Sequence, residues 1–195
     1  MNKIVALVGM PGSGKSIVGD FFKESGFSYI RFGQITLDIV KERGLQPTED
    51  NEKIVREEVR KNHGMGAYAK LNIPKIKGLI EKGNVVVDGL YSWSEYKVLK
   101  DEFGELLIVI CVYAPPTLRY KRLSERKLEA SDKILRNRPF SPEDARRRDY
   151  NEIENIEKGG PIAMADYILI NTRSVEELKK QIENLLKELK PHHGP

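Results

Sequence analysis

The chain has 195 residues, of which 39% are hydrophobic and 32% charged, the size and composition of one globular domain. Its 33 Lys and Arg residues against 29 Asp and Glu residues leave a net charge of +4, which favours a surface of mixed charge over a nucleic-acid groove. The single cysteine, Cys111, excludes an internal disulfide, and no apolar run approaches the roughly 20 residues that span a bilayer. We therefore expect a cytoplasmic protein with no membrane partner, and the composition argues against a nucleic-acid partner. Both a monomer and a dimer remain open.

An apolar strand is predicted at residues 4–8, and the segment G-M-P-G-S-G-K-S follows it directly at 9–16. Between a strand and an amphipathic helix, this pattern predicts a loop that binds nucleotide phosphates, because glycines let backbone amides curl around phosphate oxygens. Lys15 would reach the β- and γ-phosphates of ATP, and the Ser16 hydroxyl would ligate Mg²⁺. The alternative is a glycine-rich turn that binds nothing. The predicted nucleotide contacts of this segment are Gly9, Pro11, Gly12, Ser13, Gly14, Lys15, Ser16 and Ile17.

A second strand is predicted over 27–32, and three helices follow it, at 33–44, 48–63 and 67–81. In the last of them Pro74 should kink or split the helix, because proline lacks an amide hydrogen and clashes with the preceding turn. Three helices are more than a crossover between neighbouring strands needs. We expect the segment from about 33 to 82 to be an insertion at the mouth of the sheet, where a second substrate is held.

The third predicted strand, 84–88, is an apolar run that ends on a carboxylate, Asp88. Ser92 and Glu95 form a capping box for the next helix. The fourth strand, 106–112, is continuously apolar instead of alternating, which is typical of a strand covered on both faces in a parallel sheet. Strands that alternate with helices in this way predict an α/β fold with a five-stranded parallel sheet and helices on both faces.

A strongly cationic stretch follows the fourth strand. One helix is predicted over 117–126, and another, from the Ser141 cap to Lys158, should end at the Gly-Gly-Pro segment 159–161. The stretch is either a solvated, mobile segment or a basic flap, a lid at about 123–147 that closes over phosphates. Its basic residues are Arg119, Lys121, Arg122, Arg126, Lys127, Lys133, Arg136 and Arg138.

The fifth strand is predicted over 166–170, and a capping box at Ser174 and Glu177 begins a last amphipathic helix. A single domain should thus span residues 1–190. The tail 191–195 is polar, and we expect disorder there in preference to a metal site on its histidines.

Several of these segments together resemble the P-loop nucleoside monophosphate kinases, the group that contains adenylate kinase and dephospho-coenzyme A kinase. The chain looks most like the archaeal adenylate-kinase-related proteins. The resemblance rests on the loop at 9–16, the Val87-Asp88-Gly89 end of the third strand, the run 122–126, and the segments 142–150 and 165–171. It implies a P-loop fold with strand order 2-3-1-4-5, and transfer of the γ-phosphoryl group of ATP, with Mg²⁺, to a small phosphorylated acceptor.

The resemblance also implies roles for single residues. Asp88 would orient the waters of the metal, although a strand-end carboxylate can also cap a helix. Asn171 would lie beside the nucleotide, and one of Arg146, Arg147 and Arg148 would contact phosphate, with Arg148 as the candidate. The residues expected to act on the transferring phosphate are Lys15, Asp88, Arg122, Arg126, Arg138 and Arg148.

The acceptor side departs from the family pattern. Adenylate kinases place an arginine four residues after the glycine that opens the first acceptor-site helix, and here that position is Leu37 after Gly33. They place another shortly after the Asp-Gly of the third strand, where Leu90, Tyr91 and Ser92 follow Gly89. The acidic residue that dephospho-coenzyme A kinase carries after the second strand is also absent. Substitutes are available, so the predicted acceptor site comprises Arg31, Gly33, Arg60 and Gly89, although Arg60 could equally be an ordinary exposed helical arginine.

These departures leave two functions open. The first is an ATP-dependent kinase whose acceptor differs in shape from both named substrates. The second is a nucleotide-dependent ATPase or switch that acts on a protein or RNA partner. A third hypothesis, a kinase that phosphorylates the ends of nucleic acids, is supported only by the mildly positive net charge of the chain.

Overall fold

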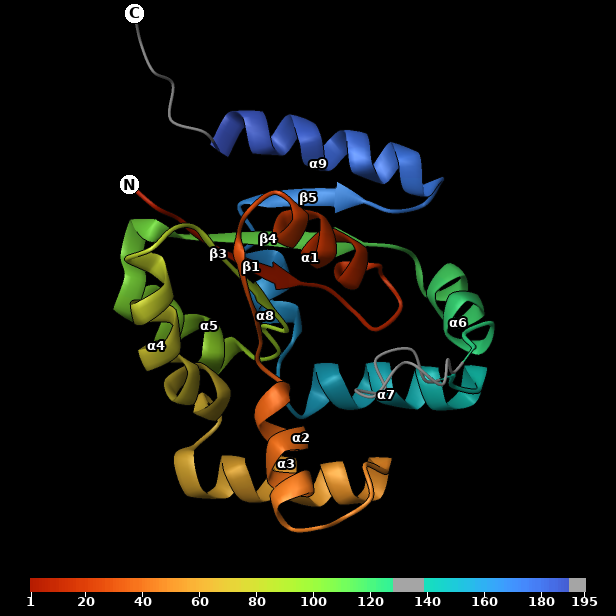
Figure 1. The fold of residues 1–195 in the computed structure, drawn as a ribbon. Coiled ribbons are helices and arrows are strands. Elements are labelled where there is room, and N and C mark those ends of the chain that lie inside the picture. Colours follow the sequence, from red (N-terminus) through yellow and green to blue (C-terminus); the bar gives the residue numbers. More distant parts are fainter. Residues whose placement is uncertain (128–138, 190–195) are drawn as a thin grey trace, which may run out of the picture.

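The computed structural model of the protein describes residues 1–127 and 139–189 (Figure 1). These residues form a five-stranded parallel sheet in the order β2-β3-β1-β4-β5, which confirms the predicted fold. In register, Leu7 of β1 lies opposite Asp88 of β3 and Ile110 of β4, so the carboxyl ends of the central strands meet at one edge. The strands are β1 (Ile4–Val8), β2 (Ser28–Arg31), β3 (Val85–Asp88), β4 (Leu107–Tyr113) and β5 (Tyr167–Ile170).

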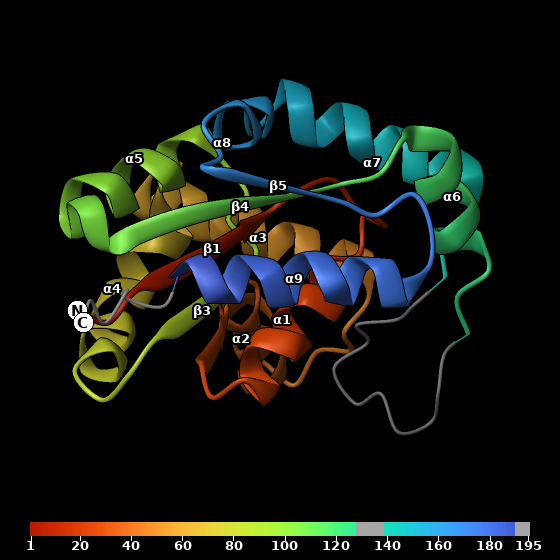
Figure 2. The ribbon, with the colours of Figure 1, turned by 90° about the horizontal axis from the view of Figure 1, so that it is seen from above.

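Helices cover both faces of the sheet (Figure 2). One face packs its buried Val5 and Leu7 against α1 (Lys15–Glu24) and α9 (Val175–Leu189). The other packs Ile4, Ala6 and Val8 against helices that include α4 (Ala67–Ile80), α5 (Trp93–Phe103) and α8 (Gly159–Ala163). A 3₁₀ turn, Gly104–Leu106, links α5 to β4. None of the helices in these two described stretches combines the length and apolar character that crossing a bilayer requires.

The insertion between β2 and β3 consists of α2 (Gln34–Glu42), α3 (Glu49–His63) and α4. Thr48 caps α3, its side-chain oxygen accepting a hydrogen bond from the amide of Asn51 at 3.3 Å. Of the two outcomes predicted at Pro74, a kink or a split, the split does not occur, because α4 runs as one element through Pro74. Buried side chains such as Tyr68 and Ile76 hold α4 in place, and this packing outweighs the one backbone hydrogen bond that proline removes.

Two further helices are α6 (Pro116–Ser124) and α7 (Pro142–Glu154). They lie on the side of the molecule away from α4 of the insertion (Figure 1). The predicted extension of α7 to Lys158 is wrong: the helix ends at Glu154, and the Gly-Gly-Pro segment opens α8. Glu157 adopts a φ of +52°, a left-handed conformation that no helix continues through. The amide of Lys158 then donates to the carbonyl of Glu152 at 3.1 Å, which closes the turn.

The sheet has two edge strands, β2 and β5, and α9 contacts the edge at β5. There the side chain of Gln181 from α9 meets Ile170 twice, its Oε1 accepting from the Ile170 amide at 2.9 Å and its Nε2 donating to the Ile170 carbonyl at 2.9 Å. Ser174 caps α9 through the amide of Glu177 at 3.2 Å, while the Glu177 carboxylate pairs with Arg173 instead of closing the predicted capping box.

Candidate functional site

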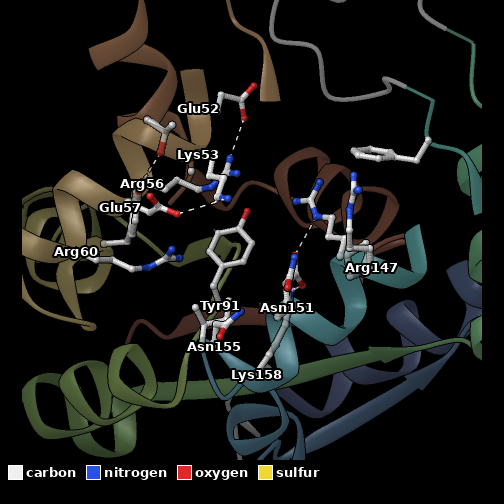
Figure 3. A pocket seen from close by; sticks show the side chains of 18 of the residues that line it. Glu52, Lys53, Arg56, Glu57, Arg60, Tyr91, Arg147, Asn151, Asn155 and Lys158 are labelled. Carbon is white, nitrogen blue, oxygen red and sulfur yellow. Dashed lines mark hydrogen bonds and ion pairs between the residues drawn. The ribbon is translucent and has the colours of Figure 1, made fainter. Parts of the chain in front are cut away.

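A cleft of about 1300 Å³ opens at the carboxyl edge of the sheet, between the insertion and α7 (Figure 3). The floor of the cleft consists of Pro11, Gly12 and Lys15 of the glycine-rich loop, Arg31 at the end of β2, and Tyr91 after β3. Arg56 and Arg60 of α3 line one wall, and Arg147 and Arg148 of α7 line the other. Cationic side chains therefore face each other across the cleft.

The glycine-rich loop takes a shape that its glycines alone permit. Gly9, Gly12 and Gly14 have φ values of +146°, +78° and +100°. A Cβ on Gly14 would lie 2.2 Å from Nδ2 of Asn171, and one on Gly9 would lie 2.4 Å from the carbonyl oxygen of Val112. Inside the loop, the hydroxyl oxygen of Ser13 is buried with no hydrogen-bond partner among the described residues. The loop is thus a tight cradle with a free polar group, which fits a bound phosphate.

Lys15 begins α1, followed in its first turn by Ser16 and Ile17. Its ammonium donates to the carbonyls of Gly9 at 2.7 Å and Met10 at 3.2 Å, folded back over the loop. Burial, and next the charge of Lys158, lower the pKa of Lys15 to about 7. An anion at this point would favour its charged form.

Two predicted site residues, Arg122 and Asn171, lie next to the glycine-rich loop. Asn171, just after β5, donates from Nδ2 to the carbonyl of Ser13 at 2.8 Å and accepts from Arg122 at 3.3 Å. The NH1 nitrogen of Arg122 is buried and has no partner among the described residues. The structure thus brings Arg122 and Asn171 to the loop.

Asp88 ends β3 and is 9% exposed. Its Oδ2 accepts a hydrogen bond from the Tyr29 hydroxyl at 2.7 Å. Gly89 follows with a φ of +100°, and a Cβ there would lie 2.7 Å from the ring of Tyr91. The ring therefore packs directly against the backbone at the strand end.

The predicted acceptor residues Arg31, Gly33 and Arg60 line the cleft. Two of their guanidinium nitrogens, NH1 of Arg31 and Nε of Arg60, are buried without partners among the described residues. Arg60 lies over the ring of Tyr68, 5.6 Å from its centroid. Leu37 and Tyr91, where adenylate kinases carry arginines, also line the cleft.

The lid arginines divide into different environments. Arg148 is 34% exposed and donates from Nε to Glu152 at 3.0 Å inside the cleft, whereas Arg147 is 75% exposed and pairs with Asp144. Arg146 is directed to the Tyr150 hydroxyl on the surface. Arg126 also lines the cleft, and Arg138 lies outside the described residues.

Sequence reasoning missed Lys158 and Glu152. Lys158 is 1% exposed, forms an ion pair with Glu152, and lies over the ring of Tyr91, 5.0 Å from its centroid. Burial raises the pKa of Glu152, but the charges of Lys158 and Arg148 outweigh it and bring the pKa to about 2. No motif or periodicity marks a lysine in a turn, so no sequence signal could have found this pair.

Arg119 does not belong to a basic flap. It is 3% exposed and makes two bonds to Asp149 of α7, from NH1 to Oδ1 at 2.9 Å and from NH2 to Oδ2. NH1 also donates to the carbonyl of Pro11 at 3.0 Å. Arg119 thus ties α6 and α7 to the glycine-rich loop.

The Glu95 side chain forms a hydrogen bond with the backbone of Tyr91. Its buried carboxyl group should make the free energy of unfolding depend on pH. Its Oε2 accepts from the Tyr91 amide at 2.8 Å, and burial raises the pKa of Glu95 to about 7, opposed by that bond and by Arg60 and Lys158. A carboxyl whose pKa is raised on folding binds protons more tightly in the folded state, so the free energy of unfolding falls as pH rises from about 4.5 to 7. We expect a fall of roughly 1–3 kcal/mol, measured by urea denaturation across that range.

The control for this experiment is Glu95→Gln, which keeps an acceptor oxygen for the capping box. Its free energy of unfolding should change less between pH 4.5 and 7 than that of the wild type. An equally steep dependence in the variant would assign the effect to other groups.

Comparisons with known proteins agree with the fold described above. The sequence model of a family described as an AAA domain matches residues 5–146. A UPF0200 protein of Thermococcus gammatolerans is 37% identical over 188 residues, 95% of this chain and 95% of that protein. The crystal structure of TT1252 from Thermus thermophilus aligns with a TM-score of 0.62 at 18% identity, over 97% of this chain and 98% of that one. Shikimate kinase from Bacteroides thetaiotaomicron aligns with a TM-score of 0.59 at 15% identity, over 96% and 98%. At these identities the two structures share the fold.

Proposed function

Because the chain belongs to the UPF0200 family and carries an AAA domain of the P-loop kinase-like fold, we propose that it is a phosphotransferase. It moves the γ-phosphoryl group of ATP to a small acceptor that already carries a phosphate. The observation that carries this proposal is the cleft itself, in which the glycine-rich loop lies between two facing walls that both carry arginines. Phosphoryl transfer depends on positioning two phosphates and neutralising their charge, more than on covalent help from the protein.

The donor half is built on the loop. Its glycine cradle and the free hydroxyl of Ser13 support phosphate binding, and Lys15 would turn from the loop carbonyls to the phosphates. Arg122 and Asn171 would contact the nucleotide. Mg²⁺, held by the Ser16 hydroxyl and through waters by Asp88, would neutralise the charge of the phosphates.

The carboxylates near Lys15 support an acceptor that needs no general base. Those whose charge acts on Lys15 are Asp88 and Glu152. Glu152 is paired with Arg148 and Lys158, with its pKa about 2, so it is a poor proton acceptor. Asp88 would be occupied with the waters of Mg²⁺. A phosphate monoester has a second pKa of about 6 and is already ionised at neutral pH. A phosphate oxygen is therefore a better nucleophile for this site than a neutral hydroxyl.

The acceptor half would be the insertion at about 33–82, and Arg31 and Arg60 would contribute positive charge to the binding of the acceptor's phosphate. Both present buried guanidinium nitrogens that the described residues leave without partners. The segment at about 123–147, together with Arg126 and Arg148, would act as the lid. Arg138, which belongs to this proposed lid, lies outside the described residues.

A panel of acceptors tests the function. Nucleoside monophosphates, dephospho-coenzyme A and other phosphorylated metabolites are incubated with Mg²⁺ and ATP, and release of ADP is followed beside unphosphorylated hydroxyl acceptors such as shikimate. We expect at least one phosphorylated acceptor to raise ADP release about 100-fold or more over the acceptor-free rate, since positioning alone supplies several kcal/mol. Equal, slow release with every compound would rule out the kinase.

A second candidate is a nucleotide-dependent ATPase or switch that acts on a protein or RNA partner. It is favoured by Leu37 and Tyr91, which line the cleft in place of the arginines of adenylate kinases. This candidate predicts acceptor-independent hydrolysis and a partner retained with only one of ATP and ADP bound. Acceptor-stimulated turnover without such a partner would remove it.

A further inference from the structure

Lys158 is an unusual residue to find inside the protein. It stands in the turn between α7 and α8, it is 1% exposed, and it lines the same cleft as Lys15. Taking an ammonium group out of water is costly unless it is well paired. A lysine buried in a cleft wall therefore needs an explanation beyond packing.

The ion pair with Glu152 compensates only part of the positive charge of Lys158. Glu152 also accepts from Arg148 at 3.0 Å, so one carboxylate is shared by a guanidinium and an ammonium. Lys15 adds a further, partly buried cation nearby, and Asp88 is another carboxylate whose charge reaches it. Cations thus outnumber carboxylates at this end of the cleft. An anion bound between Lys15 and Lys158 would restore the balance and relieve the repulsion between the two lysines.

Tyr91 adds a hydrogen-bond donor to the same place. Its ring is fixed against Gly89 and beneath the Lys158 ammonium, and in Figure 3 its hydroxyl points into the cavity toward the side chains of α3. The hydroxyl makes no hydrogen bond within residues 1–127 and 139–189. Burial and the charge of Asp88 raise the pKa of Tyr91 to about 12, so the group stays protonated and can donate.

We propose that the Lys158 ammonium and the Tyr91 hydroxyl hold the phosphate of the acceptor opposite Lys15, as the acceptor-side half of one phosphate site. This inference rests on the proposed function and deepens it. It gives the chain a clamp for the acceptor phosphate in place of the arginine that adenylate kinases carry after the third strand. Its cation, Lys158, comes from the turn after α7, a different part of the fold, whereas Tyr91 itself follows the third strand.

Inorganic phosphate is the probe for this site. The protein is first saturated with Mg·ADP, which fills the donor loop, and phosphate is then titrated by calorimetry. Lys158→Met should weaken phosphate binding about tenfold or more, since a charge-assisted hydrogen bond is lost. Tyr91→Phe should weaken it about threefold to tenfold, and Lys158→Arg should bind phosphate more tightly than Lys158→Met. Affinity for Mg·ADP should change less than threefold in each.

The matched control is Lys77→Met on α4, which removes an exposed lysine paired with Glu102 outside the cleft and should leave phosphate affinity unchanged. Should Lys158→Met fail to fold, the double variant Lys158→Met, Glu152→Gln removes both charges and should show the same loss. Wild-type phosphate affinity in a folded Lys158 variant, or no phosphate binding to the wild-type protein with Mg·ADP, would overturn the proposal. If phosphate binds as expected but no compound of the acceptor panel stimulates release of ADP, the result would count against the kinase function alone.

Discussion

Lys15→Ala is expected to weaken binding of Mg·ATP about 100-fold or more, measured by calorimetry or by displacement of a fluorescent nucleotide. The lysine would contact two phosphates, and each charge-assisted hydrogen bond contributes about 1.5–3 kcal/mol. The fold should survive, because the variant removes a partly buried cation whose pKa is already lowered to about 7. Loss of its bonds to the carbonyls of Gly9 and Met10 affects the loop locally.

Circular dichroism and the melting temperature check that the Lys15→Ala protein is folded. Lys77→Ala removes an exposed lysine of α4, 56% exposed, and should bind Mg·ATP like the wild type. Affinity within threefold of wild type for Lys15→Ala would mean that the loop does not hold the nucleotide.

Arg119→Met is expected to be the most destabilising of these substitutions. It leaves the Asp149 carboxylate buried and without its guanidinium, and breaking one partner of a buried pair costs about 3–5 kcal/mol. For a domain of this length the melting temperature should fall by about 10 °C. The loss also frees the carbonyl of Pro11, so the affinity for Mg·ATP should fall with it.

The comparison for this variant is Arg147→Met. Arg147 also pairs with a carboxylate of α7, Asp144, but its side chain is 75% exposed, and such pairs contribute less than about 1 kcal/mol. Equal melting temperatures for the two variants would show that burial of the Arg119 pair is unimportant. The double variant Arg119→Met, Asp149→Leu should recover part of the lost stability, since it removes the stranded charge as well.

The phosphate loop and the sheet could be predicted because their signals are local. Three glycines, a lysine and a serine at fixed spacing describe the loop, and continuous apolar runs describe strands covered on both faces. The departure on the acceptor side was equally local, and both positions, Leu37 and Tyr91, line the cleft.

Lys158 and Arg119 could not be assigned in this way. Lys158 enters the cleft because α7 stops at Glu154 and Glu157 turns the chain, whereas the sequence favours one longer helix. Arg119 reads as one cation in a basic stretch, and its partner Asp149 is 30 residues away. In both cases the decisive contact is between segments whose approach depends on the whole fold.

Pro74 is a third case in which the local sequence is not sufficient, here for the backbone conformation of α4. The local rule, that proline interrupts a helix, holds for an isolated segment. In α4 it is overridden by neighbours on β3 and α5, which the local sequence of the helix does not reveal.

The two hydrogen bonds of Gln181 occupy part of the sheet edge at β5. Outermost strands offer free amides and carbonyls to any strand that approaches, including one from a second molecule. At Ile170 both groups are already taken by a side chain of the same chain, so an incoming strand would have to displace Gln181 before it could pair there. Growth by edge-to-edge association is thus opposed by a single amide side chain, and Gln181→Ala should aggregate more readily on heating than the wild type.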